Sequence, residues 1–246
     1  GALIIIYLYD KEITSKVTNL YDIVYLISIE RVDKWRTPKA ITTGSNLIIA
    51  IAQNPFPEIR NVIKPIFRRL AIHNRSLQFK IAVEFIKIIE NSTISIDIRK
   101  FLISIVQENI NIWAQDISKE FIYKLLLTNY DLAQLASLVL EVNPYISKDF
   151  TTQEIIELAN SRFFNVRKAV QRILLQSSER IRVNQEEIII LIGLLNSDWQ
   201  DSRQFGTKIF TDEIKINELT PKIIINICDA DKEEARMLGL NLLKRY

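Results

Sequence analysis

The sequence predicts an all-α protein, and three observations support that prediction. Hydrophobic residues make up 48% of the 246 residues, which is enough for a folded core. Glycine and proline are scarce, at 5 and 6 residues, so there are too few turn residues for an antiparallel β protein of this length. Apolar segments with helical spacing alternate with short polar turns along most of the chain. Helices joined by short turns explain all three observations.

An arginine recurs about every 35 residues, each time near the start of an apolar helical segment. The clearest copies are "NVRKAVQRILL" at 165–175, "DSRQFGTKIF" at 201–210 and "EEARMLGLNLL" at 233–243. In each copy the arginine follows an acidic or amide residue by two positions. The full series of anchors, with glutamine replacing one arginine, is Arg60, Arg99, Gln134, Arg167, Arg203 and Arg236, at spacings of 39, 35, 33, 36 and 33. Such self-similarity predicts a repeated structural unit.

Another apolar helical segment precedes each anchor, which makes the unit a helix hairpin. These preceding segments are 45–53, 75–89, 118–127, 152–159, 184–195 and 220–227. Several of them begin with residues that cap helix N-termini, namely Thr151 with Glu154, Asn184 with Glu187, and Thr220 before Pro221. We therefore predict six hairpins.

On these residues the chain resembles the HEAT-repeat family, and more broadly the armadillo-type α-α superhelix. The pairs that carry the resemblance are Ile59-Arg60, Ile98-Arg99, Val166-Arg167, Ser202-Arg203 and Ala235-Arg236. The resemblance covers residues 45–246 and implies a right-handed solenoid of about six HEAT-like hairpins in a single continuous domain. Gln134 departs from the pattern, and Pro65 should kink the first anchored helix.

Residues 1–44 lack the anchor and are expected to form an N-terminal cap or a degenerate repeat. The segment "ALIIIYLY" at 2–9 fits either a helix or a strand. Because the chain begins with Gly1 rather than methionine, we expect it to be part of a longer protein.

The recurring arginines are predicted to be structural. Their regular position after an acid or amide suits a ladder of hydrogen bonds that joins successive turns. The predicted ladder residues are Arg60, Arg99, Arg167, Arg203 and Arg236.

The net charge of +3 hides two basic segments. Residues 60–80 hold six Lys or Arg and no acid, and residues 162–182 hold six against Glu179, so the rest sums to 3 − 11 = −8. Such segments attract acidic partners or phosphates. If the anchored helices line a concave face, as the resemblance implies, the partner-binding residues are Lys64, Arg68, Lys100, Lys168, Arg172 and Lys208. The alternative is that these are ordinary solvated surface charges.

The chain offers little for catalysis or for metal or cofactor binding. His73 and Cys228 are the only residues of their types, so neither a Cys/His zinc site nor a serine-type triad has its usual members. The five glycines form no phosphate-binding motif. We predict no catalytic residue, no metal and no cofactor. A HEAT-like family of alkylpurine DNA glycosylases makes Trp199 and Asp201 a minor enzymatic alternative, although Trp199 is expected to pack and Asp201 occupies the ordinary repeat position.

The composition also bears on location. A single cysteine cannot form an intrachain disulfide, which favours a cytoplasmic setting. The longest apolar runs fall short of the ~18 to 20 residues that span a bilayer, so no membrane association is predicted.

The expected function is that of a non-catalytic scaffold for protein interactions. Stacked hairpins expose a long curved surface, which would present a partly basic groove to an acidic protein segment or to another domain of the same polypeptide. The alternative is a module that binds nucleic-acid phosphates without reading bases.

Overall fold

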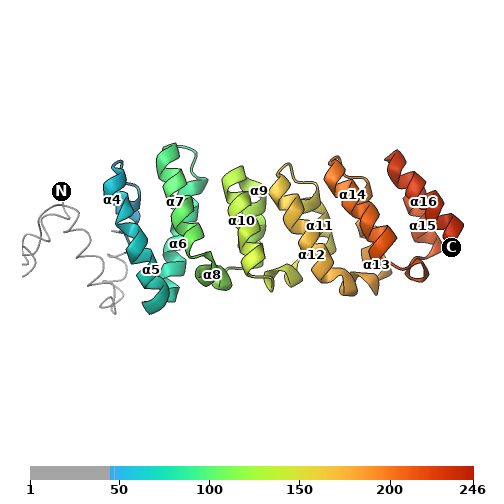
Figure 1. The fold of residues 1–246 in the computed structure, drawn as a ribbon, viewed down its shortest axis with the longest axis horizontal. Coiled ribbons are helices and arrows are strands. Elements are labelled where there is room, and N and C mark those ends of the chain that lie inside the picture. The colour runs from blue at the N-terminus through green and yellow to red at the C-terminus, as the bar shows by residue number, and fades with distance from the viewer. Residues whose placement is uncertain (1–44, 47) are drawn as a thin grey trace, which may run out of the picture. The chain divides into compact units, whose positions relative to one another are not determined.

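The computed structural model describes residues 45, 46 and 48–246 (Figure 1). Within these residues the regular structure consists of thirteen α-helices from Pro57 onward, a helical stretch at residues 45, 46 and 48–52, and short 3-10 and π segments, with no strand. The predicted all-α class is confirmed. The predictions for residues 1–44, including the N-terminal cap, lie outside the described residues.

The chain forms two compact units, the first ending at Asp116 and the second covering Ile117–Tyr246. The first contains α4 (Pro57–Asn61), α5 (Ile63–His73), α6 (Arg75–Glu90), α7 (Ile96–Glu108) and α8 (Ile110–Trp113). The second contains α9 (Lys119–Thr128), α10 (Tyr130–Val142), α11 (Thr152–Ala159), α12 (Phe164–Arg182), α13 (Gln185–Leu195), α14 (Gln200–Lys208), α15 (Pro221–Cys228) and α16 (Glu233–Arg245). That one array continues through both units stays a prediction.

The helices of the second unit begin where the capping residues predict. At α11 the Thr151 hydroxyl accepts a hydrogen bond from the N–H of Glu154, whose carboxylate accepts one from the N–H of Thr151. The side chain of Asn184 accepts from the N–H of Glu186 at the start of α13, and Thr220 caps α15. These side chains satisfy N–H groups that have no partner within the helix. The predicted starts are confirmed, but the predicted pairing of Asn184 with Glu187 is wrong, because Glu187 accepts a hydrogen bond from the Thr152 hydroxyl instead.

The first anchored helix is broken in two ahead of Pro65. Helix α4 ends at Asn61, and α5 starts at Ile63. Proline has no N–H to donate to the carbonyl four residues earlier, which is that of Asn61, and its ring would clash with that carbonyl. The expected kink therefore takes the form of a helix end at Asn61.

The helices of the second unit pack in neighbouring pairs and form two layers. The pairs are α9 with α10, α11 with α12, α13 with α14, and α15 with α16. Successive pairs also touch, through α10 with α12, α11 with α13, and α13 with α15. In Figure 1 the second helices of the pairs lie nearer the viewer than the first helices. Isoleucine and leucine side chains on both layers fill the space between them.

Three pairs in the second unit share a turn of the same length. The turns are residues 160–163, 196–199 and 229–232, each four residues long. Glycine lets the two helices of a pair come close after these turns. A Cβ on Gly239 would lie 2.6 Å from the backbone nitrogen of Cys228, and one on Gly206 would lie 2.8 Å from the Cβ of Leu194.

Candidate partner-binding face and arginine ladder

Four of the five predicted ladder arginines tie the helix that carries them to the turn before it. Each is the fourth residue of its helix, and its Nη1 donates to turn carbonyls five or six residues earlier. The acceptors are Asn54 (2.7 Å) and Pro55 (3.0 Å) for Arg60, Ser161 (2.8 Å) for Arg167, Ser197 (2.9 Å) and Asp198 (3.0 Å) for Arg203, and Ala230 (3.0 Å) and Asp231 (2.8 Å) for Arg236. A guanidinium group has enough donors to satisfy these carbonyls together.

Arg99 makes a different contact with its turn. Its Nη2 donates to the carbonyl of Asn91, eight residues earlier, at 3.1 Å. The turn before α7 is residues 91–95, one residue longer than the three four-residue turns of the second unit. The longer turn moves the nearest carbonyls, so the arginine reaches further back.

Within the second unit, two arginines also reach forward to the next pair. Arg167 Nε donates to both carboxylate oxygens of Asp201, at 2.9 and 3.1 Å, and Arg203 Nε donates to Glu234 at 3.2 Å. Each acid lies two residues before the next arginine, so the recurring acid-x-Arg spacing links neighbouring turns. Arg167 is only 6% exposed. This buried guanidinium thus has a paired carboxylate and a carbonyl acceptor, and removing either partner would leave a buried charge less well compensated.

Other groups of the same turns reinforce this ladder. The indole N–H of Trp199 donates to the carbonyl of Asn160 at 3.1 Å, and the N–H of Asp231 donates to the side chain of Asn196 at 3.0 Å. Lys232 forms an ion pair with Asp198 at 3.2 Å. Three successive turns are thereby joined along one edge of the unit.

The ladder is not continued by Arg60. Among the residues that the structure describes, its Nε has no hydrogen-bond partner, and its guanidinium lies 5.5 Å from the centre of the Phe101 ring. The spacing of 39 residues between Arg60 and Arg99 exceeds those in the second unit.

The structure shifts the anchor predicted at Gln134 by one position. The fourth residue of α10 is the buried Ala133, and Gln134 is exposed. Only Asn129 separates α9 from α10, and its side chain caps α10 by accepting from the N–H of Leu132. A one-residue turn has no series of backbone carbonyls to which an arginine at the fourth position of the helix could donate. Alanine therefore fits this fourth position of α10.

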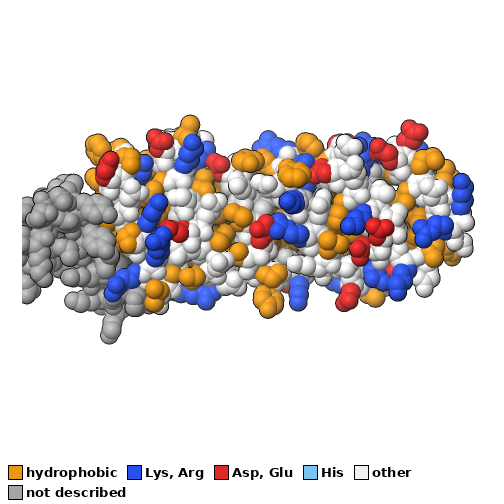
Figure 2. Space-filling model, viewed as in Figure 1, with side chains coloured by type: hydrophobic (Ala, Val, Ile, Leu, Met, Phe, Trp, Pro, Cys, Tyr) orange, Lys and Arg blue, Asp and Glu red, His pale blue; other side chains and the backbone are white. Residues whose placement is uncertain are grey.

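The six predicted partner-binding residues divide between the two units. Lys64, Arg68 and Lys100 belong to the first unit, and Lys168, Arg172 and Lys208 to the second. Two of the arginines are neutralised by carboxylates, Arg68 by Glu108 and Arg172 by Glu141. Figure 2 shows acidic side chains beside basic ones on the face formed by the second helices.

Two of the three predicted partner-binding residues in the second unit stay available. Lys168 on α12 and Lys208 at the end of α14 are exposed, and within the described chain neither forms an ion pair. Next to the Arg172–Glu141 pair is a cavity of about 90 Å³ between α10 and α12. Pockets for small molecules usually measure roughly 300 to 1,000 Å³. This face is therefore better suited to contact with a chain segment than to enclosing a small molecule.

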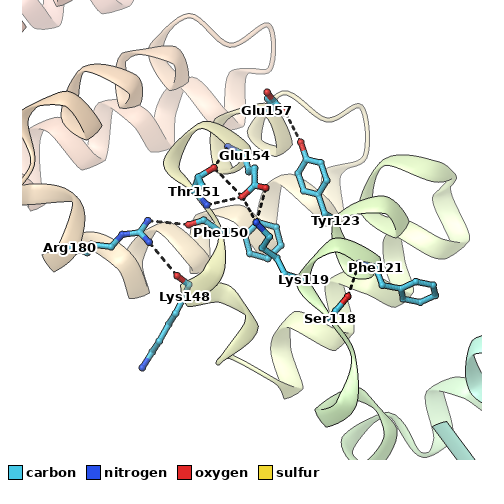
Figure 3. A network of polar contacts seen from close by, with 10 residues as sticks. All are labelled: Ser118, Lys119, Phe121, Tyr123, Lys148, Phe150, Thr151, Glu154, Glu157 and Arg180. Atoms are coloured by element: carbon cyan, nitrogen blue, oxygen red, sulfur yellow. Dashed lines mark hydrogen bonds and ion pairs between the residues drawn. The ribbon is translucent and has the colours of Figure 1, made fainter. Parts of the chain in front are cut away.

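A polar network holds the first helices of two neighbouring pairs together (Figure 3). Lys119 on α9 forms an ion pair with Glu154 on α11 at 3.0 Å, and the Tyr123 hydroxyl donates to Glu157. Burial raises the pKa of Glu154, but hydrogen bonds from Thr151 and Lys119 outweigh it and leave this pKa below its usual value. Burial and the neighbouring Glu157 raise the pKa of Tyr123 to about 12. The network thus stabilises a charged carboxylate and a neutral phenol.

The residues considered for enzymatic chemistry are occupied by structural contacts. Asp201 accepts from Arg167, and the Arg167 guanidinium lies 4.1 Å from the centre of the Trp199 ring. Cys228 is a free, half-buried thiol that packs against α16 at Gly239. Among the described residues, no three His, Cys, Asp or Glu side chains gather where a metal ion could bind, and no helix has the length and apolarity to cross a membrane.

Sequence reasoning missed a group of aromatic residues at the starts of the second helices. Tyr130 and Phe164 are the first residues of α10 and α12, and Phe163 and Trp199 directly precede α12 and α14. The available signal was an aromatic residue within one position of each of these helix starts. In Figure 2, hydrophobic side chains gather at the upper ends of α10 and α12.

The chain matches no protein-family model and no curated protein sequence.

Proposed function

We propose that the chain is a HEAT-like, right-handed solenoid of helix hairpins that acts as a non-catalytic scaffold for protein interactions. The repeated contact between each arginine and the turn before it, together with the ladder from Arg167 to Asp201 and from Arg203 to Glu234, supports the repeat architecture. A rigid stack of this kind exposes one row of helices to a partner. The single cysteine favours a cytoplasmic setting for the scaffold.

The proposed partner is an acidic protein segment that binds the second helices of the second unit. The observation that carries this proposal is the exposure of Lys168 and Lys208, which form no ion pair within the described chain. Arg172 contributes less than the sequence predicts, because Glu141 already neutralises it.

The same charge distribution makes nucleic acid the weaker candidate. A phosphate backbone needs several free cations in a row, since each neutralised phosphate adds to affinity. On this face the Arg172–Glu141 and Arg167–Asp201 pairs interrupt such a row. An enzymatic role finds no support in a site where Trp199 and Asp201 are both held by Arg167.

Fluorescence anisotropy with a labelled glutamate-rich peptide tests the proposed function. Lys168→Glu combined with Lys208→Glu should weaken binding by about tenfold, because two attractive surface contacts become repulsive. The control is Lys222→Glu, which reverses an exposed charge on a first helix, α15. The proposal would be contradicted if all variants bound the peptide with equal affinity. It would also be contradicted if the chain bound DNA tightly and in a salt-dependent way, and the double variant abolished that binding.

A further inference from the structure

The aromatic side chains at the starts of the second helices form a fixed strip beside Lys168. The aromatic strip consists of Tyr130, Phe163, Phe164 and Trp199. The Tyr130 and Phe163 rings meet edge to face, with centroids 6.2 Å apart and planes at 68°. The Arg167 guanidinium lies 5.7 Å from the Phe164 centroid and 4.1 Å from that of Trp199, and so contacts both rings. Arg167 is itself fixed by Asp201 and Ser161.

These rings are exposed to an unusual degree for large apolar side chains. Tyr130 is 57% exposed, Phe164 is 56% exposed and Trp199 is 37% exposed. Rings held by neighbouring groups lose little conformational freedom on binding, which is why aromatic residues dominate the energetics of many interfaces. The strip therefore offers exposed, fixed apolar rings against which an apolar side chain of a partner can pack.

Free positive charge lies directly beside the strip. Lys168 follows Phe164 by four residues on α12, so the two side chains are neighbours on one helix face. The Arg162 guanidinium lies 4.8 Å from the centre of the Phe163 ring. The nearby carboxylate of Asp201 is neutralised by Arg167. A partner that covers the strip therefore meets apolar rings and unpaired cations together.

We propose that the aromatic strip and Lys168 form one docking surface for an acidic protein segment that carries an aromatic or aliphatic side chain close to its carboxylates. The carboxylates would meet Lys168, and the apolar side chain would pack against the exposed rings of the strip, above all Phe164. This inference rests on the proposed function and adds to it the chemistry by which the partner is selected. A nucleic acid fits less well, because Arg162 and Lys168 alone are too few cations to follow a phosphate backbone.

Two labelled peptides test the inference on the full chain. One is rich in glutamate and contains two phenylalanines, and the other has both phenylalanines replaced by serine. We expect the phenylalanine peptide to bind the unmodified chain about tenfold more tightly, because a ring leaves water on binding. Phe164→Ser should remove most of that difference, and Lys168→Glu should weaken binding of both peptides.

A matched control and a folding control accompany this test. Val183→Ser replaces an apolar residue that is 85% exposed immediately after the opposite end of α12, and it should leave both affinities unchanged. Thermal unfolding of Phe164→Ser should match that of the unmodified chain, since an exposed ring contributes little to the core. If Phe164→Ser is destabilised, Tyr130→Ser serves as the second variant of the strip.

The outcomes separate the inference from the proposed function. Equal binding of the two peptides would overturn the inference and leave the acidic-segment scaffold standing. Binding of neither peptide would overturn both. Two other outcomes would overturn the inference by identifying another occupant of the strip. One is self-association of the chain that is lost in Phe164→Ser. The other is binding of single-stranded DNA that is lost in Phe164→Ser, while neither peptide binds.

Discussion

At the scale of single residues, the recurring arginines and the lysines beside them have different roles. Arg167 is almost fully buried, and it contacts the turn before it, a carboxylate of the next pair and two aromatic rings. Lys168 is the next residue along the chain, yet it is exposed and forms no ion pair within the described residues. Adjacent residues of a helix point in different directions, which is why one basic residue is buried in contacts within the unit while its neighbour is exposed and available to the proposed partner.

Replacing Arg167 by alanine should lower the free energy of unfolding by about 1 to 3 kcal/mol. The substitution leaves the carbonyl of Ser161 and the carboxylate of Asp201 without their donor. Urea unfolding measures the effect, and Lys168→Ala on the same helix should change the value by less than about 0.5 kcal/mol. If both variants unfold at the same urea concentration as the unmodified chain, the prediction that Arg167 stabilises the fold is wrong.

At the scale of helices, a pH-sensitive contact joins α9 to α11. The pKa of Glu154 is lower in the folded chain than its usual value of 4.5, because hydrogen bonds from Thr151 and Lys119 outweigh the effect of burial. A carboxylate with a lowered folded-state pKa stabilises the fold above its unfolded-state pKa. That contribution is lost as pH falls from about 4.5 through the lower, folded-state pKa.

Glu154→Gln should flatten this part of the pH dependence of stability. The free energy of unfolding of the unmodified chain should fall as pH drops below the usual pKa of glutamate, whereas the variant should fall less over the same range. Urea unfolding at a series of pH values provides the measurement. Glu186→Gln, an exposed acid on α13, is the control and should retain the full dependence. Parallel curves for Glu154→Gln and the unmodified chain would refute the contribution of this contact.

The close approach of α15 and α16 depends on Gly239. At an interior helix position, alanine normally stabilises the helix relative to glycine by up to about 1 kcal/mol. Here a Cβ would lie 2.6 Å from the backbone nitrogen of Cys228 and 2.9 Å from its Cα, so the two helices would have to separate. We expect Gly239→Ala to reduce the free energy of unfolding by roughly 1 to 3 kcal/mol. Asn241→Ala, at an exposed position of α16, should be neutral or slightly stabilising. A stabilised Gly239→Ala variant would show that the helices can move apart freely.

Helix positions were predictable to a useful degree because capping and periodicity are local properties. Thr151 with Glu154 and Thr220 before Pro221 marked helix starts that the structure contains. The anchor at Gln134 was misplaced by one residue, because the single-residue turn at Asn129 is invisible in an apolar pattern. The aromatic strip was missed for a different reason. Two of its contacts, Tyr130 with Phe163 and Arg167 with Trp199, join residues more than 30 positions apart, and a single sequence does not reveal them.

At the scale of the whole molecule, charge pairing changes what the composition implies. The sequence places six Lys or Arg residues in 60–80 and another six in 162–182, which resembles two basic patches. The structure pairs Arg68 with Glu108 and Arg172 with Glu141, and it uses Arg167 to hold its own unit together. Of the six basic residues in 162–182, four pair with carboxylates, and within the described residues only Arg162 and Lys168 form no ion pair. This pairing supports the proposed protein partner rather than a phosphate backbone, which needs several free cations in a row.

Photo-crosslinking tests the central claim, that the second helices of the second unit are the partner-binding face. The glutamate-rich peptide with phenylalanines, carrying a photoreactive group, is crosslinked to the full chain, and the modified residues are located by mass spectrometry. We predict crosslinks on α10, α12 and α14, concentrated near Phe164, Lys168 and Lys208. Crosslinks concentrated instead on the first helices α11, α13 and α15 would contradict the claim.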